Sequence, residues 1–254
     1  MPTYAISDIH GCFDEFNELL RMIKFNPEQD IIYVLGDVID RGDRVMDALN
    51  YIRRTKNIHM LFGNHEEMML DYYDYADRLW FRNGCKSTKE QFESLPKEKR
   101  EVIVRYLRRR PFYKTLTVNG RRFFLSHAGL NPYLRFCDQE DEFLLWSREE
   151  FYGSPALEKY ICIFGHTQTC SLNDDITDCS VWLDPLHGDK ICIDCGVSYS
   201  GALAALRLDD GEIFYAKSIP AGFNTTWLPK DIKPREENIF TSLDKIRRTA
   251  PATD

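Results

Sequence analysis

The sequence predicts one large domain of the α/β class. Apolar, strand-like runs alternate with helix-like runs through the first half of the chain, which is the pattern of βαβ units. Polar segments that contain glycine follow several of these runs, and ligands bind at the carboxyl ends of strands in open α/β sheets. The length of 254 residues and the hydrophobic content of 43% are sufficient for a sizeable core.

The first half of the chain is expected to begin with a βαβαβ unit. Strands are predicted at 3–7, 31–35 and 58–62, with helices at 13–23 and 45–54 between them. In the first helix the apolar residues recur at spacings of three, four and one, so they share one face. We expect this face to pack on the sheet.

A helical region is expected after the third strand. A helix is predicted from residue 66 to about residue 80, and its methionines and tyrosines at helical spacing indicate core packing. Residues 86–110 are polar with a helical pattern, which indicates a helical insertion.

The second half of the chain is expected to form strands. Runs at 114–118 and 122–126 flank Asn119-Gly120, a pair that suits the positive φ angles of a tight hairpin. Further strands, which we expect to close a second sheet, are predicted at 160–164, 191–194, 202–208 and 213–217. The catalytic domain is expected to span 1–220. A polar, proline-punctuated extension at 221–254 is expected to follow the surface or fray.

Charge and hydropathy exclude several classes of function. The net charge of −7 disfavours nucleic acid as a partner, because affinity for a polyanion depends on Lys and Arg. The arginine cluster at 105–110 is interpreted as a solvated helix face. The chain has no signal-peptide pattern at its start and no stretch of about 18 apolar residues, so we expect a cytoplasmic protein without membrane contact.

Eight cysteines are scattered along the chain and are interpreted as reduced thiols. Cys192 and Cys195, with Cys170 and Cys179, could form a four-thiolate zinc site. However, 191–194 has the pattern of a buried strand, in which residues three apart point to opposite faces. Burial as small hydrophobic side chains is therefore the favoured interpretation.

Five short segments carry most of the candidate chemistry and hold four of the six histidines. Each places an imidazole, carboxylate or amide beside a glycine, close to the end of an apolar run. The segments are Asp8-Ile9-His10-Gly11, Gly36-Asp37-Val38-Ile39-Asp40-Arg41-Gly42, Gly63-Asn64-His65-Glu66, His127-Ala128-Gly129 and Gly165-His166-Thr167. Side chains of these types without thiolates suit divalent Mn, Fe or Zn. The candidate ligands are Asp8, His10, Asp37, Asn64, His127 and His166. Asp37 is expected to bridge two ions about 3.5 to 4 Å apart.

These motifs resemble a known family. The G-D-x-x-D-R-G form at 36–42 and the G-N-H-E form at 63–66 resemble the phosphoprotein phosphatases of the calcineurin-like metallophosphoesterase superfamily. Segments at 145–148, 164–169 and 193–199 resemble its bacterial and bacteriophage branch, and the resemblance covers about 3–217. The resemblance implies four layers, in which two mixed sheets pack between helices with a dinuclear metal site at the strand carboxyl ends.

The resemblance also implies roles for individual residues. His65 would be the general acid that protonates the leaving group, and Asp40 would orient its imidazole. Arg41 and Arg148 would bind the phosphate, and Tyr199 would lie at the mouth of the site. The implied enzyme is a protein serine/threonine phosphatase that also has phosphotyrosine as a candidate substrate. It acts on phosphorylated proteins or peptides by attack of a water or hydroxide between two metal ions, with Mn favoured over Fe or Zn.

Three other functions compete with this one. A symmetrical dinucleoside tetraphosphate hydrolase is the second expectation, but such members tend to lack the aspartate at Asp40 and to have aspartate at the position of Glu66. Nuclease-like phosphodiesterases usually carry a second histidine where this chain has Gln168. A catalytically silent scaffold should have lost a metal ligand, and none is missing.

Overall fold

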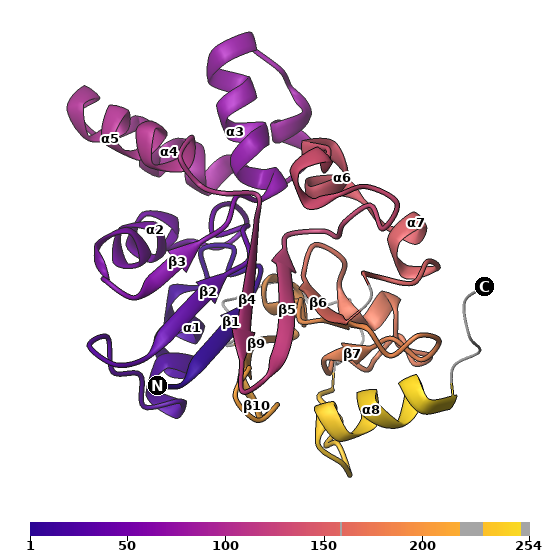
Figure 1. Cartoon of the computed structure of the whole chain (residues 1–254). Coiled ribbons are helices and arrows are strands. Elements are labelled where there is room, and N and C mark those ends of the chain that lie inside the picture. The colour runs from indigo at the N-terminus through magenta and orange to yellow at the C-terminus, as the bar shows by residue number, and fades with distance from the viewer. Residues whose placement is uncertain (158, 219–230, 250–254) are drawn as a thin grey trace.

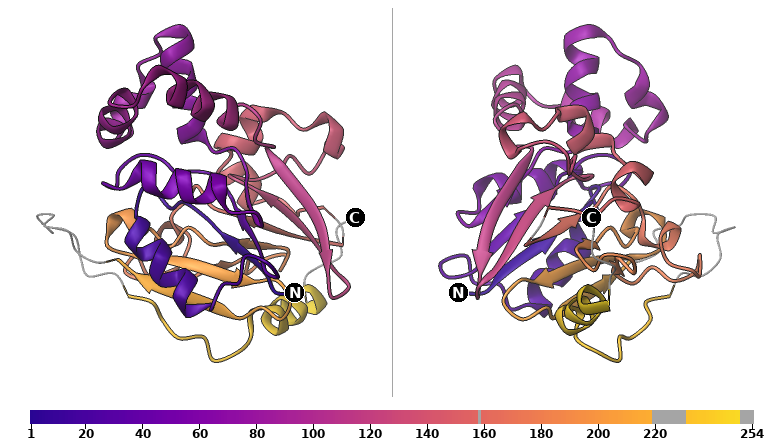
Figure 2. Two further views of the ribbon diagram at one scale, coloured as in Figure 1. Left: turned by 90° about the vertical axis from the view of Figure 1, so that its left-hand side faces the viewer. Right: turned by 45° about the vertical axis from the view of Figure 1, so that its right-hand side comes forward.

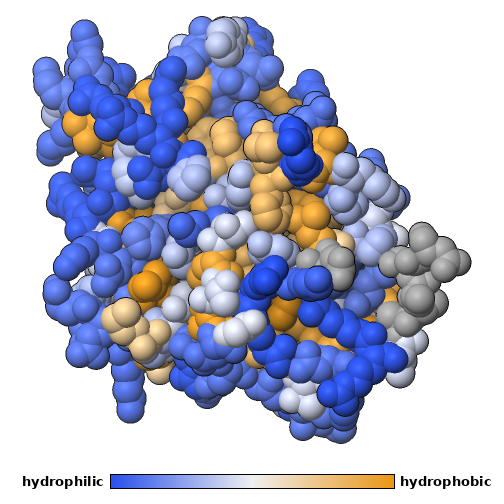
Figure 3. Space-filling view, in the orientation of Figure 1, coloured by the Kyte–Doolittle hydropathy of each residue, from blue (hydrophilic) through white to orange (hydrophobic). Residues whose placement is uncertain are grey.

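Two mixed five-stranded sheets form the centre of the molecule (Figure 1). The computed structural model describes residues 1–157, 159–218 and 231–249. Within these ranges helices cover the outer faces of both sheets, which confirms the predicted fold class. The face in Figure 3 is mostly hydrophilic, with apolar residues in scattered patches.

The first sheet has the strand order β10-β9-β1-β2-β3. Strands β1, β2 and β3 are parallel, whereas β9 is antiparallel to β1 and β10 is antiparallel to β9. The elements of this layer are β1 (Thr3–Ile6), α1 (Phe13–Met22), β2 (Ile31–Val34), α2 (Val45–Arg54), β3 (Ile58–Met60), β9 (Ala202–Arg207) and β10 (Ile213–Lys217). The expected βαβαβ unit is thus confirmed, because α1 and α2 connect the three parallel strands.

The second sheet has the strand order β4-β5-β6-β8-β7. Its strands are β4 (Tyr113–Val118), β5 (Arg121–Ser126), β6 (Tyr160–Phe164), β7 (Trp182–Leu183) and β8 (Lys190–Cys192). The expected hairpin joins β4 to β5, and both turn residues have positive φ, 47° at Asn119 and 80° at Gly120. The expectation that 202–208 and 213–217 belong to this sheet is wrong. They form β9, which pairs with β1, and β10, which pairs with β9. An apolar pattern predicts a strand but does not predict its partner.

Alternation along the strands explains the four layers. In β5, Phe123 and Leu125 contact the core between the two sheets, whereas Phe124 contacts the core under the outer helices of the second sheet. In β1, Ala5 faces the core between the sheets while Tyr4 and Ile6 face the side of α1 and α2. Both faces of these strands are therefore buried, and successive side chains pack alternately into the core between the sheets and the core under the helices.

The region between β3 and β4 stands at one end of the molecule (Figures 1 and 2). Its elements are α3 (Asn64–Tyr75), η1 (Leu79–Arg82), α4 (Lys86–Glu93) and α5 (Lys97–Leu107). The expectation that the helix beginning near residue 66 continues to about residue 80 is wrong. Helix α3 ends at Tyr75, and the next residue, Ala76, has the left-handed φ of 58°. The chain then turns into the short η1.

Several short elements were not expected from the sequence. They are η2 (Phe136–Asp138), α6 (Asp141–Trp146), α7 (Glu149–Tyr152), η3 (Thr169–Ser171) and η4 (Val197–Tyr199). Helices α6 and α7 supply Leu144 and Phe151 to the core on the outer face of the second sheet.

The C-terminal extension contains a helix, α8 (Ile239–Thr249). Its buried residues Ile239, Phe240 and Leu243 join the core between the two sheets. The helix lies at the end of the molecule opposite α3 (Figure 2). The first part of the predicted extension, 221–230, lies outside the described residues, as do 250–254. None of the helices that the structure describes has the length and apolar character needed to cross a membrane.

Candidate active site

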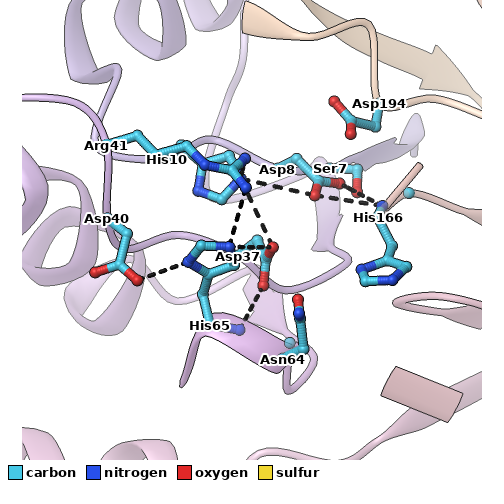
Figure 4. A network of polar contacts seen from close by, with 12 residues as sticks. Ser7, Asp8, His10, Asp37, Asp40, Arg41, Asn64, His65, His166 and Asp194 are labelled. Atoms are coloured by element: carbon cyan, nitrogen blue, oxygen red, sulfur yellow. Dashed lines mark hydrogen bonds and ion pairs between the residues drawn. The ribbon is translucent and has the colours of Figure 1, made fainter. Parts of the chain in front are cut away.

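The six predicted metal ligands converge at the carboxyl ends of strands from both sheets. Figure 4 shows them apart from His127. The loop after β1 carries Asp8 and His10, the loop after β2 carries Asp37, and the start of α3 carries Asn64. From the second sheet, His127 follows β5 and His166 follows β6. All six except His166 are nearly inaccessible to solvent, and His166 is partly buried.

Asp37 lies between two groups of these side chains. Its Oδ2 is 3.6 Å from Nε2 of His10, whereas its Oδ1 is 3.5 Å from Nε2 of His127. Asn64 Oδ1 lies 3.0 Å from the same His127 nitrogen. The two oxygens of one carboxylate therefore face different groups, which is the arrangement that a bridging ligand requires.

Hydrogen bonds fix which imidazole nitrogen faces the site. His10 Nδ1 lies 2.8 Å from the carbonyl oxygen of Ile39, and His127 Nδ1 lies 2.8 Å from that of Leu35. A carbonyl oxygen can only accept, so Nδ1 carries the proton in both residues. Their Nε2 lone pairs consequently face the site, as is usual for metal-binding histidines.

The donor set fits divalent cations. With its amide oxygen toward His127, Asn64 places one acceptor against another, and Nε2 of His166 is buried without a hydrogen-bond partner among the described residues. Ligand atoms of Asp8, Asp37 and His127 lie within 4.8 Å of one another, as do those of His10, Asp37 and His65. Buried acceptors that face each other in this way are stabilised by cations.

Burial also controls the protonation of the histidines. Burial first, and then the Arg41 guanidinium, lower the pKa of His10 well below its usual value. Burial and the neighbouring His127 and Arg148 lower the pKa of His166 in the same way. Both imidazoles are therefore neutral near pH 7 and can act as ligands. Burial raises the pKa of the Asp37 carboxyl, an electrostatic cost that a bound cation would offset.

Backbone strain is concentrated at the site. Among the described residues, eleven besides glycine have positive φ, and six of these are predicted site residues. The six are Asp8, His10, Asp37, Asp40, Arg41 and His166. Such conformations cost about 1–3 kcal/mol each and persist where the surrounding structure imposes them, which is common at functional sites.

Close packing around the carboxylates explains the glycines of the motifs. A Cβ atom on Gly165 would lie 1.9 Å from Ser7 Oγ and 2.0 Å from Asp8 Oδ2. Asp8 in turn accepts hydrogen bonds from Ser7 Oγ and from the backbone N–H of His166, at 3.2 Å for the latter. Only glycine allows the loop after β6 to approach the loop after β1 this closely.

The predicted acid and its carboxylate are in direct contact. His65 Nδ1 lies 2.6 Å from Asp40 Oδ2, and both side chains are almost fully buried. The other nitrogen, Nε2, points into the site and lies 3.1 Å from an Arg41 nitrogen. Arg41 also contacts His10 Nε2, and its guanidinium stacks on the Tyr199 ring at 5.0 Å. Tyr199 is 37% exposed, so the structure brings it to the edge of the site beside Arg41.

The second predicted arginine is held next to His166. Arg148 is exposed, and its Nη1 donates to Thr167 Oγ1 at 2.7 Å. Tyr152 of α7 shares a hydrogen bond with the same Thr167 hydroxyl. The arginine therefore approaches the site from the segment between α6 and α7.

Glu66 organises the loop that carries Asp37, a role that the sequence analysis missed. Its carboxylate accepts hydrogen bonds from four backbone N–H groups, those of Gly63, Asp37, Val38 and Ile39. The motif contained the residue, but a motif does not reveal that its side chain binds backbone. Trp80, Thr167 and the buried Asp194 also lie around the predicted residues and were not anticipated.

The remaining candidate ligands form no second metal centre. All eight cysteines are unbridged, and none belongs to a group of potential metal ligands within the described residues. Asp184, His187 and Asp189 do form such a group. However, the ammonium of the fully buried Lys190 lies 2.6 Å from Asp184 and 2.7 Å from Asp189, so both carboxylates are already paired with a cationic side chain.

Comparisons with known proteins place this site in context. The family model described as calcineurin-like phosphoesterase matches residues 1–199. A relative from Serratia proteamaculans is 32% identical over 154 residues, which are 58% of this chain and 51% of the relative. One from Erwinia tasmaniensis is 31% identical over 134 residues, 52% of this chain and 46% of the relative. Both are named symmetrical bis(5'-nucleosyl)-tetraphosphatase, and the chain spans about half the length of these curated relatives.

Solved structures show the same fold at lower identity. A protein named as a candidate diadenosine tetraphosphatase matches with a TM-score of 0.66 and 18% identity, over 86% of this chain and 94% of that one. The cold-active protein-tyrosine phosphatase of a Shewanella species matches with a TM-score of 0.52 and 18% identity, over 85% and 80%. These likenesses concern the fold alone.

The comparisons correct the expected substrate. The expectation of a protein serine/threonine phosphatase with phosphorylated proteins as partners is wrong, because the curated relatives carry the name of the alternative, a symmetrical dinucleoside tetraphosphate hydrolase. The structure gives the physical reason. Asp40 and Glu66, which favoured the protein phosphatase, are both fully buried. They contact His65 and the backbone around Asp37, and so they do not select a substrate.

Proposed function

The chain belongs to the calcineurin-like phosphoesterase family, and from this premise we propose that it hydrolyses dinucleoside tetraphosphates symmetrically, into two nucleoside diphosphates. Metal-dependent phosphoester chemistry follows from the family and from the histidine and aspartate clusters. The name shared by the curated relatives, at 30–32% identity, carries the choice of substrate.

Two divalent ions are part of the proposal. Asp8, His10 and Asp37 would hold one ion, because Nε2 of His10 lies 4.0 Å from Asp8 Oδ1 and 3.6 Å from Asp37 Oδ2. Asp37 would share the second ion with Asn64, His127 and His166. When bound, such ions neutralise phosphoryl oxygens and lower the pKa of an attacking water. Manganese is the favoured ion and iron or zinc are the alternatives, because the ligands are oxygen and imidazole nitrogen without thiolate.

Binding of the polyphosphate requires local positive charge. The net charge of the protein is −7, so its overall charge does not attract an anionic substrate. Arg41 and Arg148 supply guanidinium groups from two directions at the edges of the metal ligands. A planar guanidinium can donate two parallel hydrogen bonds to a phosphoryl group, which would orient the chain of phosphates.

His65 is proposed to complete the reaction as the proton donor. In its protonated form the imidazole carries a proton on Nε2, which faces the site, while its Nδ1–H donates a hydrogen bond to Asp40 Oδ2. Transfer of the Nε2 proton to the departing phosphate oxygen would stabilise the nucleoside diphosphate that leaves. Asp40 would hold the ring in the orientation that this transfer needs.

The cysteines support a cytoplasmic location as part of this proposal. None of the eight forms a disulfide, and most are buried. Unbridged cysteines are typical of proteins in reducing compartments.

A comparison of substrates tests the proposal. The manganese-loaded protein would be assayed side by side on diadenosine tetraphosphate and on phosphoserine, phosphothreonine and phosphotyrosine peptides. We expect kcat/KM for the dinucleotide to exceed that for every peptide by orders of magnitude. A preference for any of the phosphopeptides would refute the proposed substrate while leaving the phosphoesterase chemistry in place.

A further inference from the structure

Trp80 lies in η1 beneath the predicted acid and its carboxylate. It is 0% exposed and ranks first by volume among the fully buried side chains of the described residues. Its ring packs on those of Tyr72 and Tyr73 in α3, at centroid distances of 5.5 and 6.0 Å. This packing alone would make Trp80 a core residue.

The indole nitrogen adds a polar contact. Trp80 Nε1 donates to Asp40 Oδ2 at 2.8 Å, and the same oxygen accepts the Nδ1 proton of His65 at 2.6 Å. The other oxygen of Asp40, Oδ1, is buried and has no partner among the described residues. Among the described residues, the hydrogen bonds from His65 and Trp80 to Oδ2 are thus the ones that hold this carboxylate.

The backbone of Asp40 does not provide this orientation by itself. Asp40 has φ of 72°, and its N–H donates to the hydroxyl of Thr88 in α4 at 2.8 Å. These contacts fix the main chain and leave the side-chain rotamer to its own partners. An indole N–H can only donate, so its partner oxygen must be an acceptor. The contact therefore favours the rotamer of Asp40 in which Oδ2 faces His65.

We propose that Trp80 is a positioning residue for hydrolysis: its indole N–H holds Asp40 in the orientation that directs Nε2 of His65 into the site. The inference rests on the acid role proposed for His65, but not on the identity of the substrate. It assigns a function to the short η1 element, because the left-handed Ala76 ends α3 and η1 then places Trp80 below Asp40.

Two substrates whose leaving groups differ in basicity can distinguish a positioning role of Trp80 from a role in packing alone. Phenyl phosphate has a more basic leaving group than p-nitrophenyl phosphate, so its hydrolysis depends more on a proton donor. Trp80→Phe keeps an aromatic ring and removes the N–H. We expect it to lower kcat on phenyl phosphate by about tenfold, a part of the roughly 10²- to 10⁴-fold that a positioned acid contributes. On p-nitrophenyl phosphate we expect a fall of less than about threefold, with KM and metal content unchanged on both esters.

Two further variants make the result interpretable. Trp182→Phe removes an indole from the edge strand β7 and should leave both rates unchanged. His65→Ala should show the steepest dependence on the leaving group. If His65→Ala shows that dependence and Trp80→Phe lowers both rates equally or not at all, the inference about Trp80 is wrong. If His65→Ala lacks the dependence, the proposed acid role fails instead.

A spectroscopic measurement covers the cases in which rates are too low or the phenylalanine variant does not fold. Replacement of Trp80 by benzothienylalanine keeps the bicyclic shape and lacks the N–H. In the zinc-loaded protein we expect this change to shift the Nδ1–H proton resonance of His65, which is assigned by its loss in His65→Ala. An unchanged resonance would overturn the inference.

Discussion

At the scale of single residues, Asp37 is the centre of the proposed metal site. Its two oxygens face His10 and His127, which come from different sheets, at 3.6 and 3.5 Å. The sequence could identify Asp37 as a candidate ligand because the residue types and their order along the chain are specific. It could not show which nitrogen each imidazole presents, since this depends on carbonyl oxygens such as that of Leu35.

Replacement of Asp37 by asparagine should impair both metal sites. The amide has one oxygen and no charge, so it cannot bridge two cations. We expect Asp37→Asn to retain fewer than two ions after gel filtration, measured by elemental analysis. The matched change Asp47→Asn affects an exposed carboxylate that pairs with Arg44 and should retain both ions. A stoichiometry of two ions in Asp37→Asn would contradict the bridging role.

Removal of the proposed acid should affect turnover without affecting the metals. His65 contacts Asp40 through Nδ1. In the proposed mechanism it is the neighbour of a metal ligand and not itself a ligand. We expect His65→Ala to keep two ions and to lose about 10²-fold or more in kcat, the range that general acid catalysis contributes. Loss of both metals in this variant would show that the role is misassigned.

At the scale of elements, the sequence predicted the helices and strands that are long enough to show a periodic pattern. The parallel strands of the first sheet, α1, α2 and the β4–β5 hairpin have clear periodicity or turn residues, and they are where the sequence placed them. Strand β7 has two residues and α7 has four, which is too short for any periodicity to be recognised. The end of α3 depends on a left-handed alanine, for which the sequence gives no signal.

The contact between the loops after β1 and β6 depends on Gly165. A methyl group there would collide with Ser7 and Asp8, whose atoms cannot both move without disturbing the metal ligands. We expect Gly165→Ala to lower the free energy of unfolding by about 2 kcal/mol or more and to weaken metal binding. Gly153→Ala is a suitable control, because Gly153 has φ of −77° and the nearest atom to its Cβ position lies at 3.3 Å. Equal stability of the two variants in urea unfolding would contradict this account of the motif glycine.

At the scale of the whole molecule, the site joins the two sheets. Ligands from the loops after β1 and β2 meet those after β5 and β6 across the core between the sheets. The sequence predicted this convergence from the order of the motifs. It did not predict the substrate, because the residues used to choose it, Asp40 and Glu66, are buried and support the site from within.

Metal binding should therefore stabilise the entire fold. A ligand that binds only the folded state adds about 2.7 kcal/mol at a concentration of 100 Kd. We expect Mn²⁺ to raise Tm of the chelator-treated protein in a single transition, measured by calorimetry, and to raise it much less in Asp37→Asn. An equal shift in the two proteins would mean that the ion stabilises the fold from another place.

The products formed from diadenosine tetraphosphate test the central claim most directly. The wild-type protein, stripped of metal and then given Mn²⁺, would be incubated with this dinucleotide, and the products would be separated by anion-exchange chromatography. Symmetrical hydrolysis at a two-metal site predicts ADP as the only nucleotide product, with no reaction in the presence of chelator. Formation of ATP and AMP, or cleavage that persists in chelator, would contradict the account.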